Sequence, residues 1–111
     1  MDEQSYQGLL ESIKYLIELE KYELQRVSEV VDHIIRVKYR NVNDIEHVFD
    51  RMLDLGFIPE EELKVPYNKL LDYVRPLDSD SADAYSAFFR EKYCDEVFVE
   101  EPKTLKLTSN K

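Results

Sequence analysis

A run of 32 residues without a helix breaker constrains the fold of this chain more than any other feature. Residues 9–40 contain no glycine, proline or asparagine. Apolar side chains recur through this run at the spacing of three and four residues that places them on one face of a helix. This apolar stripe consists of Tyr6, Leu9, Leu10, Ile13, Leu16, Ile17, Leu24, Val27, Val30, Val31 and Ile34. The pattern predicts a helix over about residues 5–39.

A helix of that length is longer than the domain it belongs to. At 1.5 Å per residue it spans about 50 Å, whereas a compact domain of this size is about 35 Å across. Glu20 and Glu23 interrupt the stripe near its middle. Either the helix overhangs the fold and pairs with something else, or it breaks near residues 18–21. We favour a long helix, straight or kinked, because a tight hairpin there would lack any turn residue.

The same helix carries a second apolar face about half a turn away from the stripe. Tyr15, Leu19 and Tyr22 follow one another at intervals of four and three residues. Other helices could cover this face from a second side of the bundle. Alternatively it contacts a protein partner, since aromatic side chains are enriched at the centres of protein interfaces. We take these three residues as the candidate partner-binding apolar face.

The next stretch has readable signals for both ends of a helix. Asn43 is expected to cap its start, with Glu46 reaching back to the cap's own N–H, and Gly56 is expected to end it in the left-handed conformation. Between these ends one apolar stripe is predicted to face the core, formed by Ile45, Val48, Phe49, Met52 and Leu53. This is the pattern of a core helix, without catalytic chemistry.

Shorter helices are predicted in the second half of the chain. Residues 59–63 favour one or two turns, and Pro66 is expected to break them and begin a new helix that ends before Pro76. Asp78 is a predicted cap for a last helix. The predicted buried residues of these two longer helices are Tyr67, Leu70, Leu71, Val74, Ala82, Tyr85, Phe88, Phe89 and Tyr93.

These patterns predict an all-α fold, a small bundle of four to five helices. Only 2 glycines and 4 prolines among 111 residues also favour helices over a turn-rich β fold. Residues 97–99 and 104–108 are β-type runs. We therefore expect a single helical domain over residues 1–96 and an extended or hairpin-like C-terminal tail over residues 97–111.

Compartment is inferred from apolar runs, the N-terminal residues and cysteine content. No apolar run approaches the roughly 20 residues that cross a bilayer, and the acidic, polar N-terminal residues are unlike a signal peptide. The single cysteine, Cys94, excludes an internal disulfide framework. We expect a cytoplasmic protein that does not bind membranes.

Few residues are suited to catalysis or metal binding. His33 and His47 both lie away from the apolar stripes, whereas metal sites in bundles project into the core. Asp95 and Glu96 follow Cys94, and nearby negative charge raises the pKa of a thiol and disfavours the reactive thiolate. Two glycines cannot build a phosphate-binding loop. We therefore expect no enzyme, no metal site and no cofactor.

Nucleic-acid binding is not expected either. The formal net charge is −9, which repels a phosphate backbone. Arg36, Lys38 and Arg40 do cluster near the end of the long helix, but a helix C-terminus favours basic residues for its own dipole.

Two protein-interaction hypotheses remain. In the first, the chain is a scaffold or oligomerisation module, and its partner is another protein or a second copy of itself. In the second, it is an acidic inhibitor, of the immunity-protein, antitoxin or phage-blocker type, that covers a basic site on its target. The carboxylates proposed for this alternative are Glu60, Glu61, Glu62, Asp78, Asp80 and Asp83.

Overall fold

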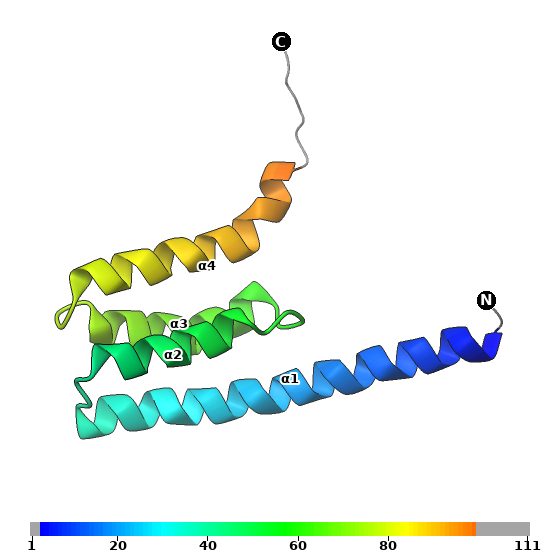
Figure 1. Cartoon of the computed structure of the whole chain (residues 1–111), viewed down its shortest axis with the longest axis horizontal. Coiled ribbons are helices and arrows are strands. Elements are labelled where there is room, and N and C mark those ends of the chain that lie inside the picture. Colours follow the sequence, from blue (N-terminus) through cyan, green and yellow to red (C-terminus); the bar gives the residue numbers. More distant parts are fainter. Residues whose placement is uncertain (1–2, 100–111) are drawn as a thin grey trace, which may run out of the picture.

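The computed structural model describes residues 3–99, which form four α-helices and contain no β-strand (Figure 1). The predicted all-α bundle is therefore confirmed. The helices are α1 (Glu3–Val37), α2 (Val42–Leu53), α3 (Glu60–Val74) and α4 (Ser79–Val99). None of these four helices is long and apolar enough to cross a membrane.

The four helices run alternately up and down and pack in three layers (Figure 1). Helices α2 and α3 form the middle layer, with α1 on one side of them and α4 on the other. Short connections hold consecutive helices antiparallel, as expected for an up-and-down bundle. As a result, α1 contacts α2 and α3 but does not contact α4.

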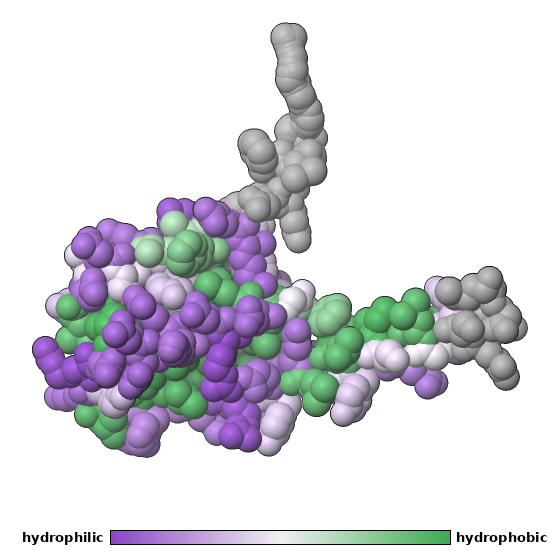
Figure 2. All heavy atoms as spheres, in the orientation of Figure 1, coloured by the Kyte–Doolittle hydropathy of each residue, from purple (hydrophilic) through white to green (hydrophobic). Residues whose placement is uncertain are grey.

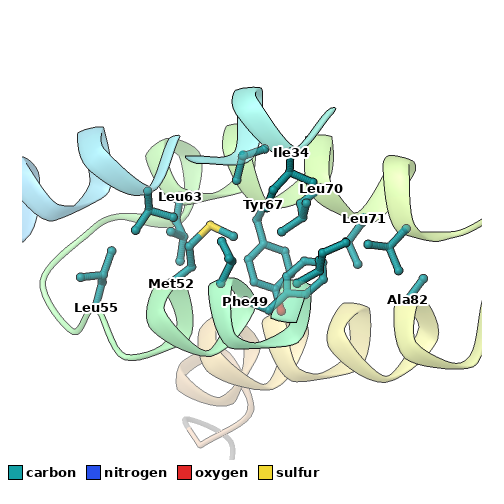
Figure 3. Packing of buried hydrophobic residues seen from close by; sticks show 14 of the residues in the cluster. Ile34, Phe49, Met52, Leu55, Leu63, Tyr67, Leu70, Leu71 and Ala82 are labelled. Carbon is teal, nitrogen blue, oxygen red and sulfur yellow. The ribbon is translucent and has the colours of Figure 1, made fainter. Parts of the chain in front are cut away.

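The core lies between these layers and draws on all four helices (Figure 3). Phe49 of α2 and Tyr67 of α3 are its two largest fully buried side chains, and their rings are 5.0 Å apart. The buried apolar residues are Val27, Val31, Ile34, Ile45, Val48, Phe49, Met52, Leu55, Ile58, Leu63, Tyr67, Leu70, Leu71, Val74 and Ala82. The predicted stripes of α2 and α3 are confirmed, because nearly all of their members belong to this set.

Helix α1 is continuous through residues 18–21, so the alternative that it breaks there is wrong. It ends at Val37 and is followed by Lys38, which has a left-handed φ of 58°. The Tyr39 N–H donates to the Ile34 carbonyl and the Lys38 N–H to the Ile35 carbonyl. These two bonds form a Schellman motif, which satisfies carbonyls that the end of a helix leaves free.

The ends of α2 differ from the prediction. Its cap is Asn41, whose side-chain oxygen accepts from the Asp44 N–H at 3.2 Å, and not Asn43. Glu46 does not reach back to the cap, because its carboxylate accepts a 2.6 Å hydrogen bond from the Ser81 hydroxyl of α4. The helix ends at Asp54 in the right-handed conformation, and Gly56 has no positive φ. A different local cap, Asn41, thus replaces Asn43, and a tertiary contact takes the carboxylate of Glu46.

Helix α3 runs through Pro66, where a break was predicted. Proline cannot donate to the carbonyl four residues earlier, which normally destabilises a helix interior. Pro66 is nevertheless buried, on the same face as Leu63, Tyr67 and Leu70. Burial of this continuous apolar face offsets the lost hydrogen bond, because helix stability in proteins comes mainly from packing.

The start of α4 agrees with the prediction and its end does not. Asp78 caps the helix by accepting from the Ser81 N–H at 3.1 Å. Residues 97–99, expected to be extended, belong to the helix, while residues 100–111 lie outside the described residues. Ala82, Tyr85, Phe89 and Tyr93 pack in or against the core, but Phe88 is exposed.

Candidate functional site

Helix α1 extends well beyond the helices that cover it (Figure 1). Its 35 residues span about 50 Å, whereas the 12 residues of α2 and the 15 of α3 span roughly 18 and 22 Å. The N-terminal part of α1 therefore projects past the α2–α3 loop, and no other described element lies beside it. We call residues 3–19 the overhang.

Polar contacts fix the point where the overhang leaves the bundle. The Glu20 carboxylate accepts hydrogen bonds from the backbone N–H groups of Gly56 at 3.0 Å and Phe57 at 2.7 Å, both in the α2–α3 loop. One turn further on, Glu23 forms an ion pair with Arg51 of α2. The two acidic residues that interrupt the apolar stripe are thus anchors for α2 and its loop. At these positions α1 is continuous, although the sequence had also allowed a break there.

The apolar stripe of the overhang points in the same direction as the buried stripe of α1. Leu10, Ile13 and Ile17 continue the spacing of Leu24 and Val27, so at 100° per residue they project from the same side of the helix. Tyr6, Leu9 and Leu16 flank them, and these three side chains are 52%, 51% and 45% exposed. Figure 2 shows the overhang as a projecting arm with hydrophobic side chains along it. Leu10, Ile13 and Ile17 themselves are half-buried. In the described chain, the core face of α1 thus continues over residues 6–17, about three turns, with no other helix packed on it.

The predicted partner-binding face also lies at this end of α1. Tyr15, Leu19 and Tyr22 are 65%, 45% and 59% exposed, and they project from the side of the helix roughly opposite the stripe. The interpretation that other helices cover this face is wrong for the described chain, because α2 and α3 pack on the other side and α4 lies beyond them.

Two carboxylates of α2 accept hydrogen bonds from side chains of α4. Glu46 accepts from the Ser81 hydroxyl, and one turn later Asp50 accepts from the Tyr85 hydroxyl at 2.9 Å. Both partners belong to α4, where they are also one turn apart. These two acidic side chains therefore join α2 to α4.

The acidic residues of the inhibitor hypothesis fall into two separate groups. Glu60, Glu61 and Glu62 occupy the first turn of α3, and Asp78 and the other aspartates lie at the start of α4. Because α3 and α4 are antiparallel, α3 separates the groups by its length, about 20 Å (Figure 1). Asp83 is also paired with Arg75 at 2.7 Å. The structure does not bring these six residues onto one surface.

The candidate metal and base residues form no cluster in the part of the chain that is described. His33 lies 2.9 Å from Arg36 on the same exposed face of α1. No group of three histidine, cysteine, aspartate or glutamate side chains among the described residues is placed to hold a metal ion.

Comparison with known protein families, curated proteins and solved structures finds no match to this chain. The overhang is the part of the described fold that no other helix covers, and the sequence indicated it as one of two outcomes for the long helix. The mismatch between the length of α1 and the shorter helices after it was the signal that could have separated the overhang from the buried half.

Proposed function

We propose that this chain is a non-enzymatic protein-interaction module that binds its partner through the overhang of α1. One observation carries the proposal: the apolar stripe that forms the core in the second half of α1 continues through residues 6–17, where no described part of the chain covers it. Contiguous exposed apolar surface of this kind marks interaction sites in proteins.

The energetics of a lone helix support the proposal. Isolated helices shorter than about 12–15 residues are marginal in water, and helices in proteins gain most of their stability from packing an amphipathic face. The overhang has such a face, with Leu10, Ile13 and Ile17 at its centre. A partner that covers this face would stabilise the helix and remove apolar surface from water at about 25 cal/mol per Å².

The rest of the molecule suits a scaffold or oligomerisation role. The acidic residues of the bundle oppose non-specific association of the bundle itself, so that binding is confined to the overhang. A single cysteine in the chain fits a reducing compartment, and we place the activity in the cytoplasm. The inhibitor alternative receives less support, because its carboxylates are divided between two ends of the bundle.

Photo-crosslinking in cells tests this function. A photoreactive phenylalanine analogue at Leu16 is expected to give discrete protein adducts, with this chain or with another protein, because Leu16 lies in the exposed stripe. The same analogue at Glu91, exposed on α4, is the matched control and should give few adducts. Absence of adducts from Leu16, or equal adducts from both positions, would contradict the proposal.

A further inference from the structure

We infer that the partner of the overhang is the overhang of a second copy of this chain, packed antiparallel along the apolar stripe. This inference rests on the proposed function and specifies its partner. It would make the chain a symmetric dimer in which the bundles lie at opposite ends of a central pair of helices.

The α2–α3 loop closes one end of the apolar stripe. Glu20 lies on the stripe face of α1, and its carboxylate holds the backbone of Gly56 and Phe57 against that face. The apolar contact of a helix lying along the stripe must therefore end at this loop. The Phe57 side chain is 45% exposed there, at the base of the overhang. It offers an aromatic contact for the tip of whatever helix occupies the stripe.

This boundary decides the orientation of a second copy. In a parallel pair, both α1 helices would continue past residue 20 at the same level. Each would then occupy the space that α2 and α3 of the other copy already fill. In an antiparallel pair, each overhang contacts only the other overhang. Each bundle then lies beyond the N-terminal end of the other chain's α1. Each overhang is roughly 25 Å long. It therefore covers the apolar stripe of the other overhang from its N-terminal end to the α2–α3 loop.

The same boundary sets the register. If the tip of one helix, at Tyr6, reaches the base of the other, at Leu19, then Leu9 of each copy lies opposite Leu16 of the other. The twofold axis passes between Ser12 and Ile13. Ile13 of one copy then lies close to Ile13 of the other at the centre of the contact. An interface of this kind is isologous, the form found in most homodimers.

The available area suits a weak, reversible dimer. An aromatic side chain that is half exposed offers on the order of 100 Å², and a half-exposed leucine somewhat less. Tyr6, Leu9 and Leu16 are about half exposed, and Leu10, Ile13 and Ile17 are less exposed. With the rim around these six residues, each copy could bury at most roughly 600 Å². The total for both copies is then about 1,200 Å², the lower end of the range for specific interfaces.

The charge distribution favours the antiparallel arrangement as well. Residues 20–99 hold 18 of the 24 acidic side chains and 11 of the 15 basic ones, a net charge of −7. An antiparallel pair keeps the two acidic bundles roughly 25 Å apart. That distance exceeds the Debye length of about 8 Å at physiological salt, so their repulsion is largely screened. Within the overhang, Glu11 and Glu18 project from the side of α1 opposite the stripe.

Analytical ultracentrifugation of the full chain over a wide concentration range tests the inference. The wild type is expected to be a reversible dimer. The substitution Ile13→Lys places two like charges at the centre of the contact, and we expect it to weaken dimerisation at least about a hundredfold. The double substitution Tyr15→Ser/Tyr22→Ser, on the opposite face, is the matched control and should leave the dimer intact. Circular dichroism should show that every variant keeps its helices.

Three results would overturn the inference. A wild type that stays monomeric at all concentrations excludes self-pairing, and the proposed function then stands or falls on whether Leu16 crosslinks to a different protein. A dimer that resists Ile13→Lys excludes the stripe. A dimer lost on Tyr15→Ser/Tyr22→Ser moves the contact to the tyrosine face.

Disulfide trapping tests the orientation in a Cys94→Ser background. A mixture of the Leu9→Cys and Leu16→Cys proteins is expected to form the mixed disulfide in preference to either symmetric one, since these positions are opposed only in the antiparallel register. Preferential formation of the symmetric disulfides would show a parallel pair and would overturn the arrangement.

Discussion

Replacing Phe49 by alanine is expected to lower the free energy of unfolding by about 4 kcal/mol, the cost of deleting a buried aromatic ring and leaving a cavity. The Phe49 side chain is fully buried at the junction of α2, α3 and α4. Its ring stacks on Tyr85 at 4.7 Å and lies 5.0 Å from Tyr67. Its removal therefore weakens the packing of three helices at once. Chemical denaturation monitored by circular dichroism measures the effect.

Phe88→Ala is the matched control for this prediction. Phe88 also contacts Tyr85, edge to face at 5.1 Å, but its side chain is 43% exposed. We expect Phe88→Ala to lower the free energy of unfolding by no more than about 1.5 kcal/mol, which is the contribution of an aromatic pair. Equal losses for the two substitutions would mean that Phe49 is not at the centre of the core.

The second large effect is a loss of stability at alkaline pH. Burial raises the pKa of the Tyr67 phenol, and burial together with the hydrogen bond to Asp50 raises the pKa of Tyr85 to about 12. Both phenols hold their protons more tightly in the folded chain than in the unfolded chain, where the pKa of tyrosine is about 10. The contribution of these raised pKa values to the free energy of unfolding is thus complete below about pH 10. It is lost as the pH rises towards 12. Ionised Tyr85 would face the Asp50 carboxylate at hydrogen-bond distance.

Denaturation curves across this pH range test the prediction, with tyrosinate absorbance followed in parallel. Tyr85→Phe should reduce the fall in stability above pH 10, and Tyr67→Phe should reduce it too, although each lowers stability at neutral pH by removing a hydrogen bond. Tyr15→Phe, exposed on the overhang, is the control for general alkaline effects. A fall that is identical in wild type and both core variants would contradict the assignment.

The fold class was predictable from periodicity, and helix boundaries were less so. The spacing of Ile45, Val48, Phe49 and Met52 identified a buried face correctly, because burial of one face is what selects that spacing. The predicted capping contact of Glu46 failed because a tertiary contact competes with it. Glu46 could cap its own helix, but in the fold it bonds to Ser81, 35 residues away in sequence. The predicted break at Pro66 was wrong because packing matters more than local sequence there. Burial of the apolar face of α3 outweighs the one backbone hydrogen bond that proline cannot make.

The candidate site was predictable only in part. The length of α1 indicated an overhang as one of two outcomes. The spacing of Tyr15, Leu19 and Tyr22 identified a second apolar face but not its exposure, which the structure shows. Which half of the apolar stripe is uncovered could not be read from α1, because it depends on where α2 and α3 end. The anchoring of Gly56 and Phe57 by Glu20 decides this, and such a contact between distant segments has no local signature.

Amide hydrogen exchange along α1 tests the claim that the overhang is the partner-binding surface most directly. In dilute protein, amides of residues 6–19 are expected to exchange at least about a hundredfold faster than those of residues 24–35, which pack against the core. When the partner is bound, or when concentration drives self-association, protection should rise in residues 6–19 and remain unchanged in residues 24–35. Slow exchange of residues 6–19 at every dilution, or no gain in their protection in the bound state, would contradict the account.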